Sequence, residues 1–298
     1  IVMYVESLTN FRKFMSAARA VSRVKPIIVL KAGRTQVGAL AAASHTGAMA
    51  GEDSVYDAAF QRAGILRVKT FEELFDCAEL LAKQPKPAGP GLAIITNAGG
   101  PGVMAAEALS DLGYEPVSLS TETFQKLDQI LPPYWSKRNP IDMLGEAKPA
   151  LYRQVVEICL NAKEVNGLLI ISAPQALADT AEVAAVLVDL ILEKPIPIIT
   201  SWVGGIDMQK ERDIFNQAGI PTFDTPERAV RAFMDIFRFS KNIEMLQQIP
   251  SRLPRRPKFD RETAKNLIQE GLGAQNYLLT EIEAKALLSS YGIPVKGS

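Results

Sequence analysis

Histidine and cysteine are scarce in this sequence of 298 residues, which contains one histidine, His45, and two cysteines, Cys77 and Cys159. A single histidine excludes any site that needs two imidazoles from this chain. Two cysteines cannot build a disulfide scaffold, and no cluster has the spacing of metal ligands, so we predict no metal site. Because this use of cysteine is typical of a reducing compartment and no secretory signal is visible, we predict a cytoplasmic protein.

An excess of charge is also missing, since 33 Lys and Arg residues balance 33 Asp and Glu residues. A basic surface for nucleic acid is therefore not expected. The most apolar stretches, such as residues 184–192, are short and interrupted by Asp189, well under the ~20 residues of a membrane span. We predict neither a nucleic-acid nor a membrane partner. The content of 47% hydrophobic and 22% charged residues is ordinary for a folded protein and excludes disorder as the main state.

Short β-branched apolar runs alternate with longer amphipathic runs. The runs predict strands at residues 1–5, 27–30, 65–68, 91–96, 167–172, 197–201 and near 222. Helices are predicted at 10–24, 53–63, 102–112, 121–129, 149–161, 179–192, 208–218, 226–237 and 281–291, and residues 31–51 are interpreted as a small-residue loop. Strand and helix in turn indicate right-handed βαβ units, so the predicted fold class is α/β, with two flavodoxin-like, doubly wound parallel sheets.

Prolines suggest the domain boundaries. Pro85, Pro87 and Pro90 separate a predicted domain 1–85 from a second domain 88–245. The Pro- and Arg-rich stretch 249–257 lies in a predicted linker, residues 246–278, and residues 279–298 look like the start of another module. Because the first residue is Ile rather than Met, we interpret the sequence as a piece of a longer polypeptide or as an engineered boundary.

Two segments are rich in small residues. Residues 41–51, AAASHTGAMAG, surround His45 with side chains too small to bury its ring, so the segment is either a ligand-binding loop or a flexible surface loop. Residues 96–103, TNAGGPGV, follow a predicted strand and open a helix, which suits anion binding by backbone amides or a tight turn alone. The segment is neither a GKS/T phosphate loop nor a full GxGxxG fingerprint, since Ala105 stands where a third glycine would be.

Three further positions end or adjoin predicted strands. Glu6 follows the first strand and is either a surface carboxylate or a partner that orients His45, because strand ends of a parallel sheet share one edge. The run Asn139-Pro140-Ile141-Asp142 is a structural turn or a polar part of a site, and Ser172 ends another predicted strand.

Together these segments resemble the NDP-forming acyl-CoA synthetase family, which is related to ADP-forming acetate–CoA ligase and succinyl-CoA ligase. The motifs are YVES at 4–7, KPIIVLKAGR at 25–34, SHTGAMAG at 44–51, VYDAAFQRAGILRV at 55–68, ITNAGGPGV at 95–103 and NPIDMLG at 139–145. The segment EIEAKALLSSYGIPV at 281–295 resembles the opening of the family's ATP-grasp domain. The resemblance covers nearly the whole chain.

The resemblance implies a fragment of an enzyme that interconverts acyl-CoA, ADP and phosphate with a carboxylic acid, CoA and ATP. It implies that His45 carries the phosphoryl group and that Glu6 orients it. The implied phosphate-binding residues are Asn97, Gly99, Gly100 and Gly102, and the implied neighbours of the acyl group are Asn139, Asp142 and Ser172. The parent enzyme is expected to use CoA and ATP or ADP with Mg, to contain CoA-binding and ATP-grasp domains in the same or a partner chain, and to be an oligomer. The fragment alone is expected to be inactive and to bind no more than phosphate or sulfate.

Other functions stay open on the sequence. A ligase-like scaffold of a protein lysine acetyltransferase is expected to lack the loop histidine, which is present here as His45. A regulatory acyl-CoA-binding module would bind its ligand without a phosphorylated intermediate. A nicotinamide dehydrogenase ranks last, because its glycine fingerprint is incomplete and only Glu122 stands ~20 residues beyond Gly102 to bind a ribose.

Overall fold

The structure is a computed structural model, and it describes all residues except 47–51, 176–179, 192–194, 249–258, 274–277 and 296–298. The chain forms two compact units, residues 1–247 and 248–298. Each unit is described by itself.

The first unit begins with a three-stranded parallel sheet in the order β1-β2-β3. Its strands are β1 (Val2–Val5), β2 (Ile28–Lys31) and β3 (Leu66–Val68), and its helices are α1 (Phe11–Val21), α2 (Gln36–Thr46), α3 (Asp53–Arg62) and α4 (Phe71–Lys83). Successive side chains of β2 face opposite sides of the sheet. Val29 packs in one core with Phe60 of α3, whereas Leu30 packs in another core with Leu74 of α4.

Helix α2 contradicts the predicted loop at residues 31–51. Its run of alanines has the highest intrinsic helix propensity, so small side chains here favour a helix rather than an open loop. The hydroxyl of Thr35 accepts a hydrogen bond from the amide of Gly38 (3.1 Å), as a helix-capping side chain does. His45 consequently lies in the last turn of a helix. The end of the predicted loop, residues 47–51, lies outside the described residues.

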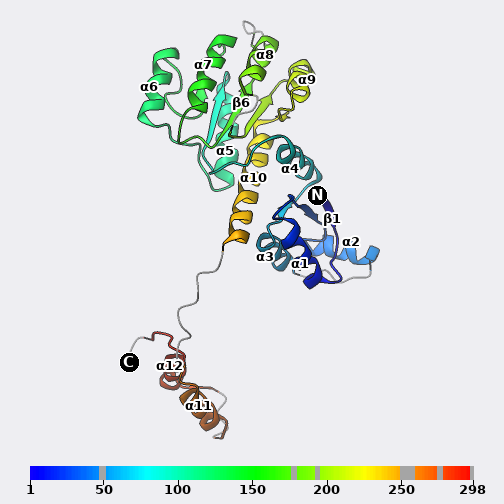
Figure 1. Cartoon of the computed structure of the whole chain (residues 1–298), viewed down its shortest axis with the longest axis vertical. Helices are drawn as coiled ribbons and strands as arrows, with labels where there is room; N and C mark the ends of the chain where they lie inside the picture. Colours follow the sequence, from blue (N-terminus) through cyan, green and yellow to red (C-terminus); the bar gives the residue numbers. More distant parts are fainter. Residues whose placement is uncertain (47–51, 176–179, 192–194, 249–258, 274–277, 296–298) are drawn as a thin grey trace. The chain divides into compact units, whose positions relative to one another are not determined.

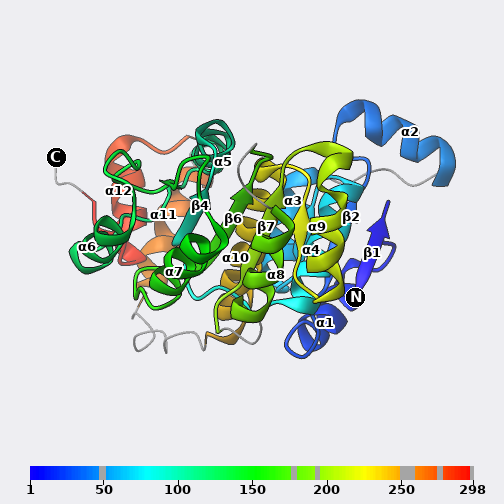
Figure 2. The ribbon, with the colours of Figure 1, turned by 90° about the horizontal axis from the view of Figure 1, so that it is seen from above.

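The second sheet has five parallel strands in the order β5-β4-β6-β7-β8. Figure 1 shows β6 in this sheet, and Figure 2 shows β4, β6 and β7 in that order. The strands are β4 (Leu92–Thr96), β5 (Ile141–Asp142), β6 (Gly167–Ser172), β7 (Ile198–Trp202) and β8 (Thr222–Phe223). The helices are α5 (Gly99–Asp111), α6 (Thr121–Ile130), α7 (Pro149–Leu160), α8 (Thr180–Ile191), a 3₁₀ turn η1 (Gly205–Met208), α9 (Gln209–Gln217) and α10 (Pro226–Gln247). Numbered within this part, the order is 2-1-3-4-5, that of the flavodoxin-like fold, so the predicted α/β class is confirmed.

Helix α10 connects the cores of the two sheets. Its N-terminal half packs Val230 and Phe233 into the core of the second sheet. Its C-terminal half places Phe239 and Ile243 in the core beneath the first sheet, and Figure 1 shows the helix extending from one sheet toward the other. The two sheets of this unit therefore share one helix.

The second unit contains α11 (Arg261–Gly273) and α12 (Glu281–Ser290). The predicted helix at 281–291 is confirmed, and its N-terminus is a capping box formed by Thr280 and Glu283. Helix α11 lies within the predicted linker, residues 246–278, where no helix is predicted from the sequence. The prolines behind that prediction all precede α11, whose N-terminus is capped by Asp260 (3.1 Å to the amide of Thr263). Among the described residues, no helix is long and apolar enough to span a membrane.

Candidate functional site

The carboxyl edge of the first sheet carries Glu6 directly after β1 and Lys31 at the end of β2. Val5 lies opposite Lys31 in the ladder, and the amide of Ala32 donates a hydrogen bond to the carbonyl of Val5 (2.9 Å). Oε1 of Glu6 accepts a hydrogen bond from the hydroxyl of Tyr4 (3.4 Å). The polypeptide then enters α2, which carries His45 at its end.

Glu6 thus follows the residue that lies opposite Lys31 in the ladder, and Lys31 is buried. The side chain of His45 lies outside the described part of the structure, so the predicted pairing of Glu6 with His45 stays a prediction. Lys31 is not among the predicted site residues, although a lysine directly after the apolar run 27–30 is unusual for a buried strand.

The second set of predicted residues lies at the topological switch point between β4 and β6, where ligands bind in sheets of this order. Asn97 follows β4 and is 2% exposed. Its side-chain amide donates to the carbonyl of Ala173 and accepts from the amide of Ala173, both at 2.9 Å. Asn97 thus joins the ends of β4 and β6, and its side chain is already occupied by the backbone.

Helix α5 begins at Gly99, earlier than the predicted start at Gly102. The amide of Gly102 is therefore directed into the helix and donates to the carbonyl of Ala98 (3.4 Å). Pro101 has no donor, so Gly99 and Gly100 provide the free amides of the first turn. Together with the partial positive charge of the helix N-terminus, these two amides form the part of the segment that could hold an anion.

The glycines of this turn differ in their surroundings. A Cβ on Gly100 would meet no atom within 4 Å, so this position is open. A Cβ on Gly102 would lie 3.0 Å from Cγ2 of Thr96 and 3.5 Å from Cβ of Pro140. Gly102 therefore allows α5 to pack closely against the strand ends, and Gly100 leaves space in front of the helix.

Asp142 adds a negative charge to the same turn. A Cβ placed on Gly99 would lie 3.3 Å from Oδ2 of Asp142. Oδ1 of Asp142 accepts a hydrogen bond from the amide of Leu144 (2.9 Å), which holds the carboxylate in place. An anion bound by Gly99 and Gly100 would therefore lie near this carboxylate.

Asn139 lies along β4 rather than at its carboxyl end. Its Oδ1 accepts from the amide of Ile94 (2.9 Å), and its Nδ2 donates to the carbonyls of Leu92 and Val117 (both 3.0 Å). The peptide bond between Asn139 and Pro140 is cis. The side chain extends the short pairing of β5 with β4, which is the structural alternative left open by the sequence.

Ser172 ends β6 and is fully buried, at 0% exposure. Its hydroxyl has no hydrogen-bond partner among the described residues. It adjoins Ala173, which Asn97 binds, and so lies at the switch point as predicted from its place at a strand end. The hydroxyl of Tyr152 on α7 donates to the carbonyl of Ile171, the residue before Ser172 (3.5 Å). Burial raises the pKa of Tyr152.

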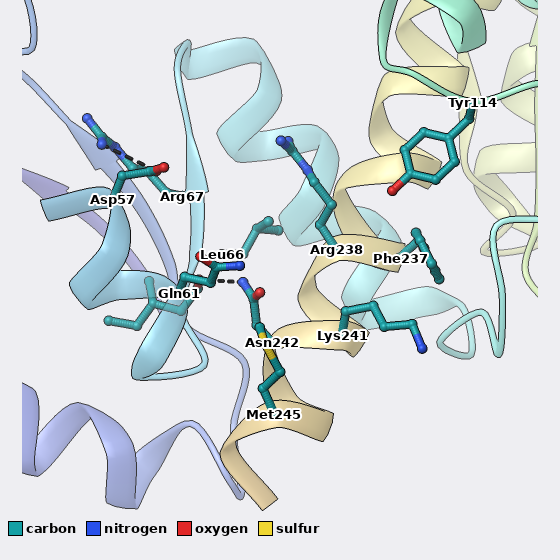
Figure 3. A pocket seen from close by; sticks show the side chains of 11 residues that line it. Asp57, Gln61, Leu66, Arg67, Tyr114, Phe237, Arg238, Lys241, Asn242 and Met245 are labelled. Carbon is teal, nitrogen blue, oxygen red and sulfur yellow. Dashed lines mark hydrogen bonds and ion pairs between the residues drawn. The ribbon is translucent and has the colours of Figure 1, made fainter. Parts of the chain in front are cut away.

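A cavity of about 350 Å³ lies elsewhere, between α3, β3 and α10 (Figure 3). Arg67 of β3 and Arg238 and Lys241 of α10 line it, and Nδ2 of Asn242 donates to the carbonyl of Ile65 (3.3 Å). Arg67 is paired with Asp57 (3.4 Å). None of the predicted site residues lines this cavity, which lies where α10 passes from one sheet to the other.

Comparison with known proteins identifies both sheets. The model of the succinyl-CoA ligase like flavodoxin domain matches residues 1–81, and that of the ligase-CoA domain matches residues 92–247. A solved structure, the dinucleotide forming acetyl-coenzyme A synthetase 1 of Candidatus Korarchaeum cryptofilum in complex with phosphate and ADP, is similar with a TM-score of 0.78 and 33% identity. The similarity covers 84% of this chain and 55% of that chain.

Curated relatives agree with the domain matches. The alpha subunit of acetate–CoA ligase [ADP-forming] I from Pyrococcus furiosus is 38% identical over 243 residues, which cover 81% of this chain and 52% of the relative. The acetate–CoA ligase [ADP-forming] of Methanocaldococcus jannaschii is 39% identical over 99% of this chain and 42% of the relative. The 4-hydroxybutyrate–CoA ligase [ADP-forming] of Nitrosopumilus maritimus is 31% identical over 100% of this chain and 42% of the relative.

The chain spans about half of the length of these relatives, or less. The family resemblance expected from the motifs is nevertheless confirmed over both sheets. The chain belongs to the family of NDP-forming acyl-CoA synthetases.

Proposed function

We propose that the chain is the central part of an enzyme that interconverts acyl-CoA, ADP and phosphate with a carboxylic acid, CoA and ATP through a phosphohistidine at His45. The observation that carries the proposal is the pair of strand edges described above. One edge leads from β2 into the histidine-bearing helix and carries Glu6, and the other presents the free amides of Gly99 and Gly100 at a switch point. Both features lie in segments that match the family models.

The chemistry uses these groups in sequence. Phosphate attacks the thioester carbonyl, and the carbon–sulfur bond breaks to give an acyl phosphate and CoA. A ring nitrogen of His45 then attacks phosphorus, and the carboxylate leaves with the electron pair of the broken oxygen–phosphorus bond. ADP finally accepts the phosphoryl group from the histidine, which regenerates the imidazole.

Each residue of the chain has a distinct task in this proposal. The carboxylate of Glu6 accepts a hydrogen bond from the imidazole N–H of His45 and so fixes the tautomer and orientation of the ring. The amides of Gly99 and Gly100 stabilise the negative oxygens of the phosphoryl group through hydrogen bonds and the dipole of α5. Asn97 aligns these amides through Ala173, and Asp142 and Ser172 adjoin the acyl group.

Other parts of the enzyme complete the reaction. We propose a CoA-binding domain, and an ATP-grasp domain that binds ATP or ADP with Mg, in the same or a partner chain. Residues 279–298, with α12, begin that ATP-grasp domain, and residues 1–85 and 88–245 form the two flavodoxin-like domains. The complete enzyme is proposed to be an oligomer in the cytoplasm.

Replacement of His45 tests the proposal. In the complete enzyme, His45→Asn should abolish incorporation of radiolabelled phosphate from acyl-CoA and phosphate, because asparagine cannot form the phosphorus–nitrogen bond. Gln36→Ala, an exposed change at the other end of α2, should keep the label. Label retained in His45→Asn would reject the assignment, and an unlabelled wild type that still binds acyl-CoA would favour an acyl-CoA-binding module.

Replacement of Glu6 tests its assigned task. Glu6→Gln should slow labelling of His45 by roughly 10²-fold, the scale of a positioned ionisable partner. Single-turnover labelling in a quenched-flow experiment measures this rate. An unchanged rate would reduce Glu6 to a structural carboxylate.

A further inference from the structure

The cavity of about 350 Å³ in Figure 3 has a positively charged lining. Arg67 of β3 lines it from the first sheet, and Arg238 and Lys241 line it from α10. Asp57 of α3 is the one carboxylate among its described lining residues. Three cations against one carboxylate produce a positive potential in a recess of the surface, which favours an anion as the occupant.

A second cavity, of about 470 Å³, adjoins the first, because Asp57, Arg67 and Arg238 line both. Each further carboxylate of the second cavity is already paired with an arginine: Asp53, Glu73 and Asp235. Lys69, which follows β3, also lines this cavity, is exposed and has no ion-pair partner in the described part of the chain. The adjoining space therefore adds a cation that no carboxylate neutralises.

The two arginines shared by the cavities can accept a further partner. A guanidinium group has five N–H donors. Among the described residues, Arg238 uses only Nη2, which donates to Asp235, so its Nη1 and Nε have no partner. Nη1 of Arg67 donates to the carbonyl of Asp53 (3.2 Å) and to Oδ1 of Asp57 at 3.4 Å, which is long for a hydrogen bond. The side chain of Asp57 is 69% exposed, so this weak pair is one that an anion could replace.

The cations come from elements that are far apart in the sequence. Figure 3 shows Arg67 and Asp57 on one side of the cavity, whereas Arg238 and Lys241 follow one another along α10. An anion bound to both sides would therefore connect the first sheet to the helix that the two sheets share. A diphosphate group suits this arrangement, because its several oxygens can accept hydrogen bonds from two guanidinium groups at once. The cavity has the volume of a small-molecule site, which begins at about 300 Å³.

We propose that the two adjoining cavities bind a small diphosphate-bearing anion through Arg67, Arg238 and Lys241, and that this anion holds β3 to α10. The site is separate from the turn at Gly99 and Gly100, neither of which lines either cavity. The proposal does not depend on the phosphohistidine mechanism. It adds a ligand that stabilises the first sheet against the shared helix.

Titration of the 298-residue chain with pyrophosphate tests the site. In NMR spectra, the Nε–Hε signals of Arg67 and Arg238 should shift with one dissociation constant, and added salt should weaken the binding. Adenosine, which has no phosphate, should leave both signals unchanged. Unshifted arginine signals, or equal shifts with adenosine, would overturn the inference. The amides of Gly99 and Gly100 report separately on the turn, so their failure to shift would count against the proposed function and not against this site.

Three exposed substitutions test which charges bind the anion. Lys241→Gln should weaken pyrophosphate binding, read from the arginine signals, by about two- to fivefold, the effect of one partly exposed charge. Asp57→Asn should strengthen binding by a similar factor, because a repelling charge is lost and Nη1 of Arg67 is released. Lys210→Gln, an exposed change on α9, is the control and should bind like wild type. Equal dissociation constants in all four proteins would overturn the inference.

Comparison with ADP distinguishes two sources of the same diphosphate group. Tighter binding of ADP than of pyrophosphate, with shifts of the ring signals of Tyr114, would support the site as one for nucleotides, since this ring lines the first cavity. Equal or weaker binding of ADP would support it as a site for inorganic diphosphate.

Hydrogen exchange tests whether the anion holds β3 to α10. In Gly100→Val, where the turn should bind little anion, saturating pyrophosphate should slow exchange of the β3 amides Leu66 and Val68 more than that of Ile94 in β4. Adding Lys241→Gln should reduce this difference at a fixed, subsaturating concentration. Exchange that is unchanged, or slowed equally in both sheets, would overturn this role of the anion.

Discussion

Gly100 and Gly102 lie in one turn but have different roles: Gly100 leaves space for an anion, and Gly102 allows close packing against Thr96. A pair of substitutions can separate these roles. Gly100→Val should weaken phosphate binding with little effect on stability, since its side chain would enter open space in front of the helix. Gly102→Val should destabilise the chain by about 1–3 kcal/mol, because its Cβ would meet Thr96. Amide-shift titration with phosphate and urea unfolding measure the two effects. Phosphate binding that is equal in wild type and Gly100→Val would exclude this turn as the anion site.

The carboxylate of Asp142 should repel an anion bound at the same turn and so lower the affinity for that anion. Asp142→Asn should raise phosphate affinity by about two- to fivefold, the effect of one partly exposed like charge, while the amide oxygen keeps the hydrogen bond from Leu144. The gain should shrink as salt is added, because the interaction is screened. An affinity that stays the same at low salt would place the bound anion away from Asp142.

At the scale of single elements, sequence periodicity predicts most of the buried strands and long helices, but it does not predict α2, α11 or the two-residue strand β5. The apolar runs that became β4, β6 and β7 were identified because each is buried on both faces. The small residues of α2 suggest a loop when glycine and alanine are weighed together, although alanine favours helices. Strand β5 has only two residues, too few for any period to be visible.

The sequence predicts which positions of the chain lie in the candidate site, but it does not predict which residues they contact. Glu6 and Asn97 follow strands, and a parallel sheet brings such ends to one edge. Their partners depend on packing between segments far apart in the sequence. No local sequence pattern predicts the hydrogen bond from Asn97 to Ala173 or the packing of Lys31 against the ring of Tyr56.

Asn139 shows how a side chain can act as part of a strand. Asn139→Ala should destabilise the chain by about 2–5 kcal/mol, since it leaves the amide of Ile94 and two carbonyls without their partner. Urea unfolding measures this change. Asn216→Ala, on the exposed side of α9, is the control and should stay within about 0.5 kcal/mol of wild type. An equally small effect for Asn139→Ala would favour a role in ligand binding instead.

At the scale of the whole molecule, α4 and α10 are joined by ion pairs between buried carboxylates and partly exposed arginines. Arg228 forms two hydrogen bonds with Asp76 (2.7 and 2.6 Å), and Arg231 pairs with Glu73 (3.2 Å). Asp235, 1% exposed, lies between Cys77 (3.6 Å) and Arg238. The connection between the sheets therefore depends on the ionisation of carboxylates.

The pH dependence of stability should report on Asp235. Burial raises its pKa above the ordinary value, while Arg238 opposes this rise. The folded chain then binds more protons than the unfolded chain just above pH ~3.9, so this group's contribution to stability falls as pH rises through that window. Relative to wild type, Asp235→Asn should gain stability as pH increases, measured by urea unfolding from acid to neutral pH. A constant difference between the two across that range would contradict the assignment.

The shared helix makes the first sheet depend on residues that follow the second sheet in the chain. Phe239→Ala should destabilise the protein by about 3–5 kcal/mol, because the ring is 1% exposed and belongs to the core beneath β2 and β3. Met245→Ala, which is 45% exposed on the same helix, is the control and should cost much less. Hydrogen exchange distinguishes local from global loosening: amides of β2 and β3 should lose protection before those of β4 and β6, because Phe239 contributes to the first core alone. Equal loss in both sheets would mean that α10 makes them one cooperative unit, so that the two flavodoxin-like parts cannot unfold separately.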